Sequence, residues 1–543
     1  MKKNVVRYSV VFVLIYVLIS MVYTLPLLMS GPRLAFNEDL PFHIARLLGL
    51  TNVLKSPVNF LTFNQGGYGV NYFYPWITYL PAVFIFKITK NLALSFSIFV
   101  TFINFILLIN THLVMYKFCR KHLQAFLCAV LYLFSAYHSL NVFLRSDIGE
   151  SISMAYIPLV VYGLYAILMK HRFDEWWILA IGMIAIGYSH LLSFMLMSIM
   201  CVILLLLNII FDRQLIAKKL LVLTKTGIFS ALALLFYFVP LFQQVHNNPV
   251  YQPNYYNLYK SSTSISEIVE NSLNNNYFSI GIILFVCVIV AFIRWKKLRN
   301  EYKVSVLITV CTIFLLSNLF PSYLLNHTFL KTIQFVWRFY EIGVFFSVIV
   351  GSLLLYEFVG RCEKREIKVG TIVGLLILLI TINFSTYSQN LNGVEQFNQK
   401  NQISMATHVE NYDYVPKKAK AGFYDMLEDN FYVDGKKVRV KHHVSESDFY
   451  IAYNNRENYD HIDVPVYVYE GQVIKNNNKL SSSENSERGL TRVKLNNGMN
   501  RIVISYRYTI LAIICAFISV SVFLLLLIIS VRNTLKYDNN RNI

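Results

Sequence analysis

The sequence predicts a polytopic α-helical membrane protein that carries one β-rich domain near its C-terminus. Of its 543 residues, 56% are hydrophobic and only 15% are charged. A soluble chain of this size would need far more charge to cover its surface. Apolar runs such as 10–23, 203–211 and 521–529 have the character that a bilayer core requires. A long polar segment, about 389–506, interrupts this pattern before the last apolar run.

Short clusters of Lys and Arg between the apolar runs predict which way each loop faces. The formal net charge is +19, which can indicate a nucleic-acid partner. No soluble segment interleaves basic and aromatic residues, so we expect no such partner. Because cytoplasmic loops carry the excess of Lys and Arg, we expect every cluster and both termini to be cytoplasmic. The clusters lie at 2–7, 117–121, 170–172, 213–219, 294–299, 361–368 and 532–541.

With these clusters inside, the chain divides into about 12 transmembrane helices. The expected spans are 7–29, 93–115, 123–143, 152–169, 176–188, 190–211, 221–243, 277–293, 303–320, 337–359, 370–387 and 508–531. The apolar stretch 75–89 is excluded, because it contains Pro81 and is shorter than the roughly 20 residues that a span needs. Counting it would also place the cluster 117–121 outside. We expect it to form a re-entrant or juxtamembrane helix within the first outer loop, 30–92.

Three regions follow from this pattern. Residues 1–387 form a transmembrane domain with outer loops, 388–507 an extracytoplasmic β-rich domain, and 508–543 a final transmembrane helix and cytoplasmic tail. Alternating residues predict strands that build a small β-sandwich, with an Asn/Ser-rich turn at 476–487. The expected strands are 437–442, 464–469, 490–495 and 501–506. The sandwich contains none of the seven cysteines, so we expect no disulfide there.

The first candidate site lies directly after the first expected span. Asp39 is placed to cap a helix that begins at Leu40, and His43 and Arg46 follow at i+4 and i+7, so the three share one helical face. A carboxylate beside an imidazole and a guanidinium suits a general base next to a phosphate site. An N-cap with a surface salt bridge explains the same spacing.

Three further sets of polar residues fall in the other outer loops. Arg145, Asp147 and Glu150 lie in one short loop, where they form either a site or a snorkelling interfacial cluster. His190 lies at the vertex of a helical hairpin, where a satisfied interfacial histidine is the plain alternative. Arg338 begins a later span among aromatic residues that suit an interfacial belt.

All four sets of residues are expected on the outer face of the membrane, and this location limits the reactions that they can catalyse. The chain has no Walker lysine and no GxGxxG motif, and neither ATP nor a nucleotide sugar is present outside the cell. A group-transfer enzyme working there needs an activated donor held in the membrane. A carboxylate base near arginines suits transfer with a phosphate leaving group.

Several segments resemble known membrane glycosyltransferases. The pair Glu38-Asp39, followed by the aromatic-Pro segment 73–80, resembles the acidic motif of the GT-C superfamily, and Asp147 or Glu150 matches its second acidic group. More narrowly, segments of the chain resemble the YfhO-like bacterial membrane proteins. These segments are DLPFHIARL, GGYGVNYFYP, RSDIGE, YSH and IQFVWRF, with a weaker extension over YDYVP (412–416) and the terminal β-domain.

The resemblance implies an outer-face transferase of the bacterial cell membrane. It would move a sugar from a polyprenyl-phosphate donor to a cell-wall glycopolymer such as teichoic acid. Asp39 or Glu38 would be the base, assisted by His43, while Arg46, Arg145, Arg338 and His190 would contact the donor phosphate. No cofactor is firmly implied, although the two acidic loops could hold a divalent metal ion. The alternatives are a transporter or flippase of lipid-linked sugars, and a non-catalytic polysaccharide assembly protein.

Overall fold

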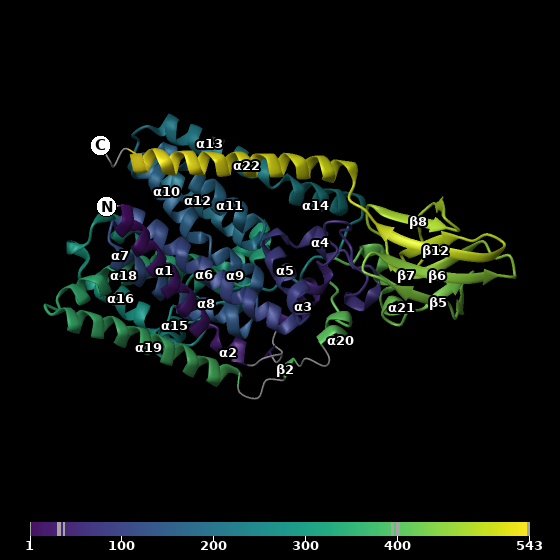
Figure 1. Ribbon diagram of the computed structural model, residues 1–543, viewed down its shortest axis with the longest axis horizontal. Coiled ribbons are helices and arrows are strands. Elements are labelled where there is room, and N and C mark those ends of the chain that lie inside the picture. Colours follow the sequence, from purple (N-terminus) through teal and green to yellow (C-terminus); the bar gives the residue numbers. More distant parts are fainter. Residues whose placement is uncertain (1, 30–33, 36–38, 392–395, 398–401, 540–543) are drawn as a thin grey trace.

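The computed structural model describes residues 2–29, 34–35, 39–391, 396–397 and 402–539. The candidate base Glu38 therefore lies outside the described residues. A long helical body carries a β-sandwich at one end, and helix α22 (Ile510–Asn539) runs back from the sandwich along the body (Figure 1). The start of α1 (Lys2–Tyr23) and the end of α22 both lie at the end of the body away from the sandwich.

Helices occupy all the segments expected to be spans. They are α1, α6 (Leu92–Cys119), α7 (His122–Leu133), α8 (Ala136–Ser139), α9 (Ile148–Met154), α10 (Ile157–Leu168), α11 (Trp176–Gly187), α12 (Leu191–Phe211), α13 (Ile216–Ala233), α14 (Leu235–Asn247), α16 (Ile282–Ile293), α17 (Asn300–Leu316), α18 (Tyr340–Gly360), α19 (Arg365–Leu391) and α22. The helical hairpin breaks between Gly187 and Leu191, as the sequence predicted.

By length and composition, six helices of the described chain can cross a membrane. They are Leu92–Cys119, Ile148–Leu168, Leu191–Phe211, Val336–Gly360, Arg365–Asn390 and Ile510–Asn533. Two bent pairs raise the number to eight if each is one span, with bends of 45° after α7 and 65° between α13 and α14. Helices such as α11 and α16 have only 12 residues, or about 18 Å against the roughly 30 Å hydrocarbon core. The count of 12 spans stays a prediction.

Short helices and 3₁₀ turns build the loops around the body. The helices are α2 (Leu25–Met29), α3 (Leu40–Gly49), α4 (Val70–Phe73), α5 (Leu80–Thr89), α15 (Ile265–Leu273), α20 (Gln402–Thr407) and α21 (Phe423–Leu427). The 3₁₀ turns lie at Phe63–Gln65, Ile77–Tyr79, Phe173–Glu175, Leu258–Ser261, Trp295–Lys297, Ser322–His327, Phe329–Ile333, Val336–Phe339 and Lys417–Lys420. In the excluded segment 75–89, α5 has ten residues, which are too few to cross a bilayer alone.

The C-terminal β-domain is a sandwich of two antiparallel five-stranded sheets. One sheet has the order β10-β11-β7-β3-β4 and the other β5-β6-β12-β8-β9. The strands are β3 (Phe431–Val433), β4 (Lys436–Val438), β5 (Lys441–Val444), β6 (Asp448–Asn455), β7 (His461–Tyr467), β8 (Gln472–Asn476), β9 (Lys479–Ser481), β10 (Glu484–Asn485), β11 (Leu490–Lys494) and β12 (Gly498–Tyr506). Fully buried residues such as Ile462, Val464, Ile502 and Ile504 form the core between the sheets. A separate pair, β1 (Leu34–Ala35) and β2 (Gln396–Phe397), joins two distant loops.

Two details of the predicted sandwich are wrong. The expected strand 437–442 is two strands, β4 and β5, which belong to different sheets because the chain crosses between the sheets at Arg439 and Val440. The expected turn 476–487 contains β9 and β10, which pair with β8 and β11.

The sandwich is fastened to the loop before α4. Phe60 packs its ring against Phe449 and Tyr506, with ring centroids 5.8 and 5.9 Å apart. The backbone N–H of Phe60 donates to Glu446 O at 3.2 Å, and that of Tyr467 donates to Gly66 O at 2.9 Å. This loop therefore packs as part of the sandwich surface, beside the helices that carry the candidate site.

Candidate active site

Asp39 occupies the N-cap position of α3 without capping it. The helix begins at Leu40 as predicted, but the Asp39 carboxylate makes no capping hydrogen bond. Instead, its Oδ2 accepts a hydrogen bond from the Arg145 guanidinium at 3.3 Å, and its backbone N–H donates to Arg145 O at 3.0 Å. The Asp39 side chain is 39% exposed. The carboxylate is thus turned toward the second acidic loop and stays open to a ligand.

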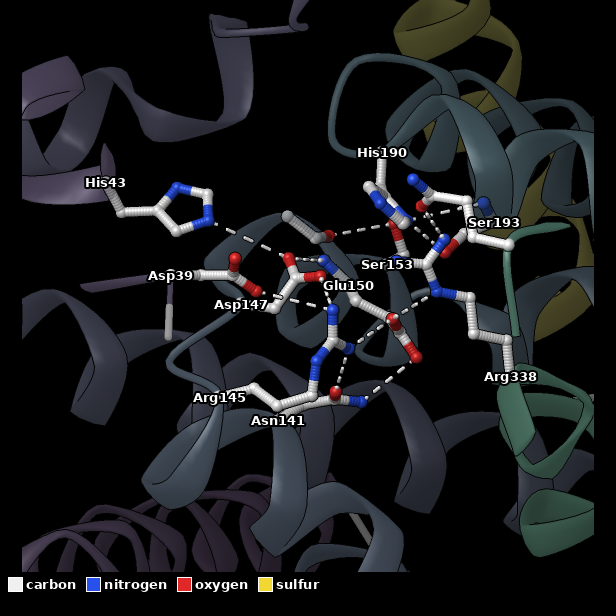
Figure 2. A network of polar contacts seen from close by, with 12 residues as sticks. Asp39, His43, Asn141, Arg145, Asp147, Glu150, Ser153, His190, Ser193 and Arg338 are labelled. Atoms are coloured by element: carbon white, nitrogen blue, oxygen red, sulfur yellow. Dashed lines mark hydrogen bonds and ion pairs between the residues drawn. The ribbon is translucent and has the colours of Figure 1, made fainter. Parts of the chain in front are cut away.

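Arg145 is the centre of the charged network. It follows a π-helical turn, Leu140–Leu144, which precedes α9. Figure 2 shows three carboxylates converging on its guanidinium. Besides Asp39, it donates to Asp147 Oδ2 at 3.0 Å and to Glu150 Oε2 at 2.9 Å, while Asn141 Oδ1 accepts at 2.9 Å. Because these groups occupy its two terminal nitrogens, Arg145 is better placed to hold the acids together than to bind a phosphate.

Asp147 is buried within the same network. One oxygen caps α9 by accepting from Glu150 N at 3.0 Å, and this oxygen lies 3.8 Å from His43 Nε2. Burial would raise the pKa of Asp147, but the Arg145 guanidinium, with His190 and His43, outweighs burial and holds the pKa below its usual value. A carboxylate with so low a proton affinity is a weak general base.

Glu150 and Arg338 form the inner side of the network. Glu150 is fully buried and accepts hydrogen bonds from Tyr137 Oη and from Asn141 Nδ2. Arg338 Nε lies 4.0 Å from Glu150 Oε2, and Arg338 Nη1 donates to Gln334 Oε1 at 2.8 Å. Glu150, a predicted second acidic group, is therefore an internal counter-ion that does not reach the cavity described below.

The other two residues of the predicted helical face, His43 and Arg46, differ in their access to the site, because only His43 lines the cavity described below. Arg46 is 1% exposed, lies over the Tyr74 ring at 3.9 Å and donates to Pro75 O at 2.6 Å. It is placed behind Tyr74, and cannot reach a phosphate in the cavity unless that ring moves. Arg46 Nη1 lies 3.4 Å from His43 Nδ1. Burial, followed by the Arg46 charge, lowers the pKa of His43 to about 3, which keeps the imidazole neutral.

His190 caps helix α12. Its Nδ1 accepts from Ser193 N at 3.4 Å and lies 2.8 Å from Ser193 Oγ. A neutral imidazole whose Nδ1 accepts carries its proton on Nε2. His190 can therefore donate from Nε2 to an oxygen in the cavity.

These side chains line a cavity of about 1110 Å³ with three kinds of wall. The charged wall comprises Asp39, His43, Arg145, Asp147, His190 and Arg338. The apolar wall comprises Leu191 and Leu192 of α12 and Leu241, Phe242 and Val245 of α14. The polar wall is the segment 404–414, which contributes Ser404, Met405, His408, Val409, Glu410, Asn411, Asp413 and Tyr414. The structure thus brings together six of the predicted site residues.

The apolar wall continues onto the outer surface of the helical body. Leu191, Phe242 and Val245 are 36%, 64% and 38% exposed. They lie at the ends of α12 and α14, and only 17% of the apolar part of α12 is buried inside the protein. The cavity therefore joins a charged site to an exposed apolar surface.

Several residues of the site were not predicted. Asn141 lies four residues before Arg145, one turn away on the same face, so helical spacing could have found it. Ser193 lies three residues after His190, a spacing that an N-cap contact could have suggested. Tyr74 acts only through tertiary contacts, and the polar wall comes from a segment that the sequence places far from the first loop. Among the described residues, no three His, Cys, Asp or Glu side chains are grouped to hold a metal ion.

The fold and site define a helical membrane protein with a charged cavity beside its C-terminal β-domain. Residues 70–389 match a family described as a 6-pyruvoyl-tetrahydropterin synthase related domain, a membrane protein. The chain belongs to this family of membrane proteins. It is also similar to an uncharacterized protein of Lactococcus lactis subsp. cremoris (strain MG1363), with 25% identity over 198 residues. That alignment covers 35% of this chain and 32% of the relative.

Proposed function

We propose that this protein is a GT-C-type, YfhO-like glycosyltransferase that works at the outer face of a bacterial cell membrane. It transfers a sugar from a polyprenyl-phosphate donor to a cell-wall or surface glycopolymer of the teichoic acid type. The observation that carries the proposal is the cavity in which a charged wall meets an exposed apolar wall. A polyprenyl-phosphate sugar has the same division, a charged head on a long apolar chain.

The reaction follows from the charged wall. An acceptor hydroxyl oxygen attacks the anomeric carbon, and a new glycosidic C–O bond forms as the bond from that carbon to the phosphate oxygen breaks. The hydroxyl proton passes to a carboxylate, and the electron pair of the broken bond leaves on polyprenyl phosphate. The site needs a base that the acceptor can reach and hydrogen-bond donors for the leaving phosphate.

Asp39 is the base that the geometry supports best. Its side chain is 39% exposed, whereas those of Asp147 and Glu150 are 5% and 1% exposed. Asp147 is also strongly bound to Arg145, which lowers its proton affinity. Asp39 is thus the carboxylate of this network that an acceptor can approach.

Arg338 and His190 are the groups best placed to hold the leaving phosphate. Both line the cavity, and Glu150, 4.0 Å from Arg338 Nε, holds the Arg338 guanidinium from its inner side. A phosphate oxygen in the cavity gains a charge-assisted hydrogen bond from such a cation. Arg145 then acts as a positioning residue that fixes Asp39 and Asp147.

The outer-face assignment rests on the basic clusters between the apolar helices. With these clusters and both termini in the cytoplasm, the first loop, the charged wall and the β-sandwich face outward. The common location of the α1 start and the α22 end supports a chain with both termini on one side (Figure 1).

The test is transfer of labelled sugar from polyprenyl phosphate to wall polymer in membranes that carry the wild type or Asp39→Asn. Asp434→Asn is the matched control, because Asp434 is exposed in a turn of the sandwich. We expect the wild type and Asp434→Asn to transfer sugar at the same rate. We expect the transfer rate of Asp39→Asn to be at least about a hundredfold lower.

Equal transfer by all three proteins would refute Asp39 as the base. No transfer by the wild type would favour a flippase or a non-catalytic assembly protein, and a lipid-translocation assay in vesicles would then separate these two.

A further inference from the structure

The polar wall has a chemistry that the transfer step does not use. Its lining includes two carboxylates, an amide, two hydroxyls and an imidazole, and it contains no Lys or Arg. A carboxylate accepts hydrogen bonds from hydroxyl groups and repels phosphate. This wall therefore suits the part of a ligand that is rich in hydroxyl groups and free of negative charge.

Asp413 is the partly buried carboxylate of this wall, whereas Glu410 is exposed. The Asp413 carboxylate forms no ion pair with any cation of the described chain, in contrast to Asp39 and Asp147, which both pair with Arg145. Its backbone is fixed, since Asp413 N donates to Asn411 Oδ1 at 2.9 Å and Tyr68 Oη donates to Asp413 O at 2.5 Å. Partial burial raises the pKa of Asp413, in keeping with a carboxylate that has no cation to stabilise it.

Three contacts fasten the polar wall, at Val409 and Tyr414. Tyr414 stacks on Phe73 with ring centroids 5.2 Å apart and planes 3° apart. Tyr469 of the sandwich region donates to Tyr414 O at 3.0 Å, and Asn64 donates to Val409 O at 3.2 Å. Because these contacts hold the wall against both the first loop and the sandwich, it can present its side chains at fixed positions.

We propose that the polar wall is the acceptor subsite, in which Asp413 accepts hydrogen bonds from a sugar or polyol unit of the glycopolymer. This assignment rests on the proposed glycosyl transfer. The apolar wall holds the lipid of the donor, the charged wall holds its phosphate and the base, and the polar wall holds the hydroxyl-bearing unit. In a polyol-phosphate acceptor, the carboxylates turn the phosphates away from this wall and leave the hydroxyl groups facing Asp413.

The test uses the full-length protein in lipid nanodiscs, with Asp413→Asn compared with the wild type and with Asp434→Asn. Three quantities are measured: the KM for a poly(ribitol phosphate) acceptor, the release of polyprenyl phosphate from donor without acceptor, and direct binding of poly(ribitol phosphate). A lost hydrogen bond to a charged group predicts a KM and a Kd that rise about tenfold or more in Asp413→Asn. In Asp413→Asn, the release of polyprenyl phosphate by water when no acceptor is present should stay at the wild-type level. In Asp434→Asn, the KM and the Kd should also stay at the wild-type level.

Two outcomes overturn the assignment. Unchanged acceptor KM and Kd in Asp413→Asn would remove Asp413 from the acceptor subsite. A loss of acceptor-free donor turnover as large as the loss of transfer would place Asp413 in the transfer centre instead. If the wild type transfers no sugar, the proposed function fails, while the binding measurement still decides whether this wall recognises the polymer.

Discussion

Replacing Arg145 by Gln tests the view that one guanidinium neutralises the acidic centre. The Arg145, Asp147 and Glu150 side chains are 6%, 5% and 1% exposed, and the two ion pairs measure 3.0 and 2.9 Å. Removing one partner of a buried ion pair costs about 3–5 kcal/mol, because the other charge stays buried. The half-exposed Asp39 pair adds less than about 1 kcal/mol. We therefore expect Arg145→Gln to lower the free energy of unfolding by about 3–5 kcal/mol.

The assay is denaturant titration of the purified protein in detergent, followed by tryptophan fluorescence. Trp337, one of the five tryptophans, lies 4.7 Å from the Arg145 guanidinium, so part of this signal comes from the site. Arg501→Gln is the matched control, since Arg501 is exposed on β12, and should change stability by less than about 0.5 kcal/mol. Adding Glu150→Gln to Arg145→Gln should restore part of the loss, because it removes a carboxylate left without its cation. The reasoning would be refuted if Arg145→Gln lost no more unfolding free energy than Arg501→Gln. It would also be refuted if the losses from Arg145→Gln and Glu150→Gln simply added in the double variant.

Three further predictions concern pH, the lipid and the packing of the site. Burial and Arg46 lower the pKa of His43 to about 3, against about 6.5 in an unfolded chain. Only the unfolded state then gains this proton as the pH falls below 6.5, so stability is lost, by about 2 kcal/mol at pH 5. Denaturant titrations at pH 7 and 5 should show that His43→Gln loses less unfolding free energy between these pH values than the wild type does. An equal loss in both proteins would contradict the lowered pKa of His43. Phe242→Ser should raise the donor KM about tenfold, whereas Phe211→Ser, at an 83% exposed position outside the cavity, should leave it unchanged; equal donor KM values would argue against the apolar wall as the lipid site. Gly149→Ala should cost about 1–3 kcal/mol in unfolding free energy, because its Cβ would meet Tyr74 Oη and lie 3.1 Å from Ser189 O. Gly227→Ala, whose Cβ meets nothing within 4 Å, should cost nothing, and a similar cost in both variants would show that the contact at Gly149 is unimportant.

The sequence predicted the charged wall because ionisable residues are scarce in apolar surroundings. Asp39, Arg145 and Asp147 were notable for that reason, and the structure brings them into contact. Arg46 shows the limit of helical spacing. Its position seven residues after Asp39 gave a shared face, but the direction of its side chain depends on Tyr74, which only the folded chain brings near.

The β-domain shows a second limit of pattern reading. The alternation through 437–442 continues unbroken although the chain crosses from one sheet to the other, because both strands alternate with the same period of two. The polar wall was missed for a different reason. Residues 412–416 stood out only through their resemblance to other membrane proteins, and nothing local links 404–411 to the charged residues. Contacts of this segment with the first loop span more than 300 residues of sequence, as the contact between Asn64 and Val409 illustrates.

The contacts between the sandwich and the first loop can form only late in biosynthesis. Asn52 donates to Glu446 O at 2.8 Å across 394 residues of sequence. The loop before α4 therefore leaves the ribosome long before the strands on which it packs. Until those strands are made, Phe60 lacks the Phe449 and Tyr506 rings that cover it. A nascent chain halted before residue 404 has the helices of the charged wall but not the polar wall, so the cavity is completed only near the end of translation.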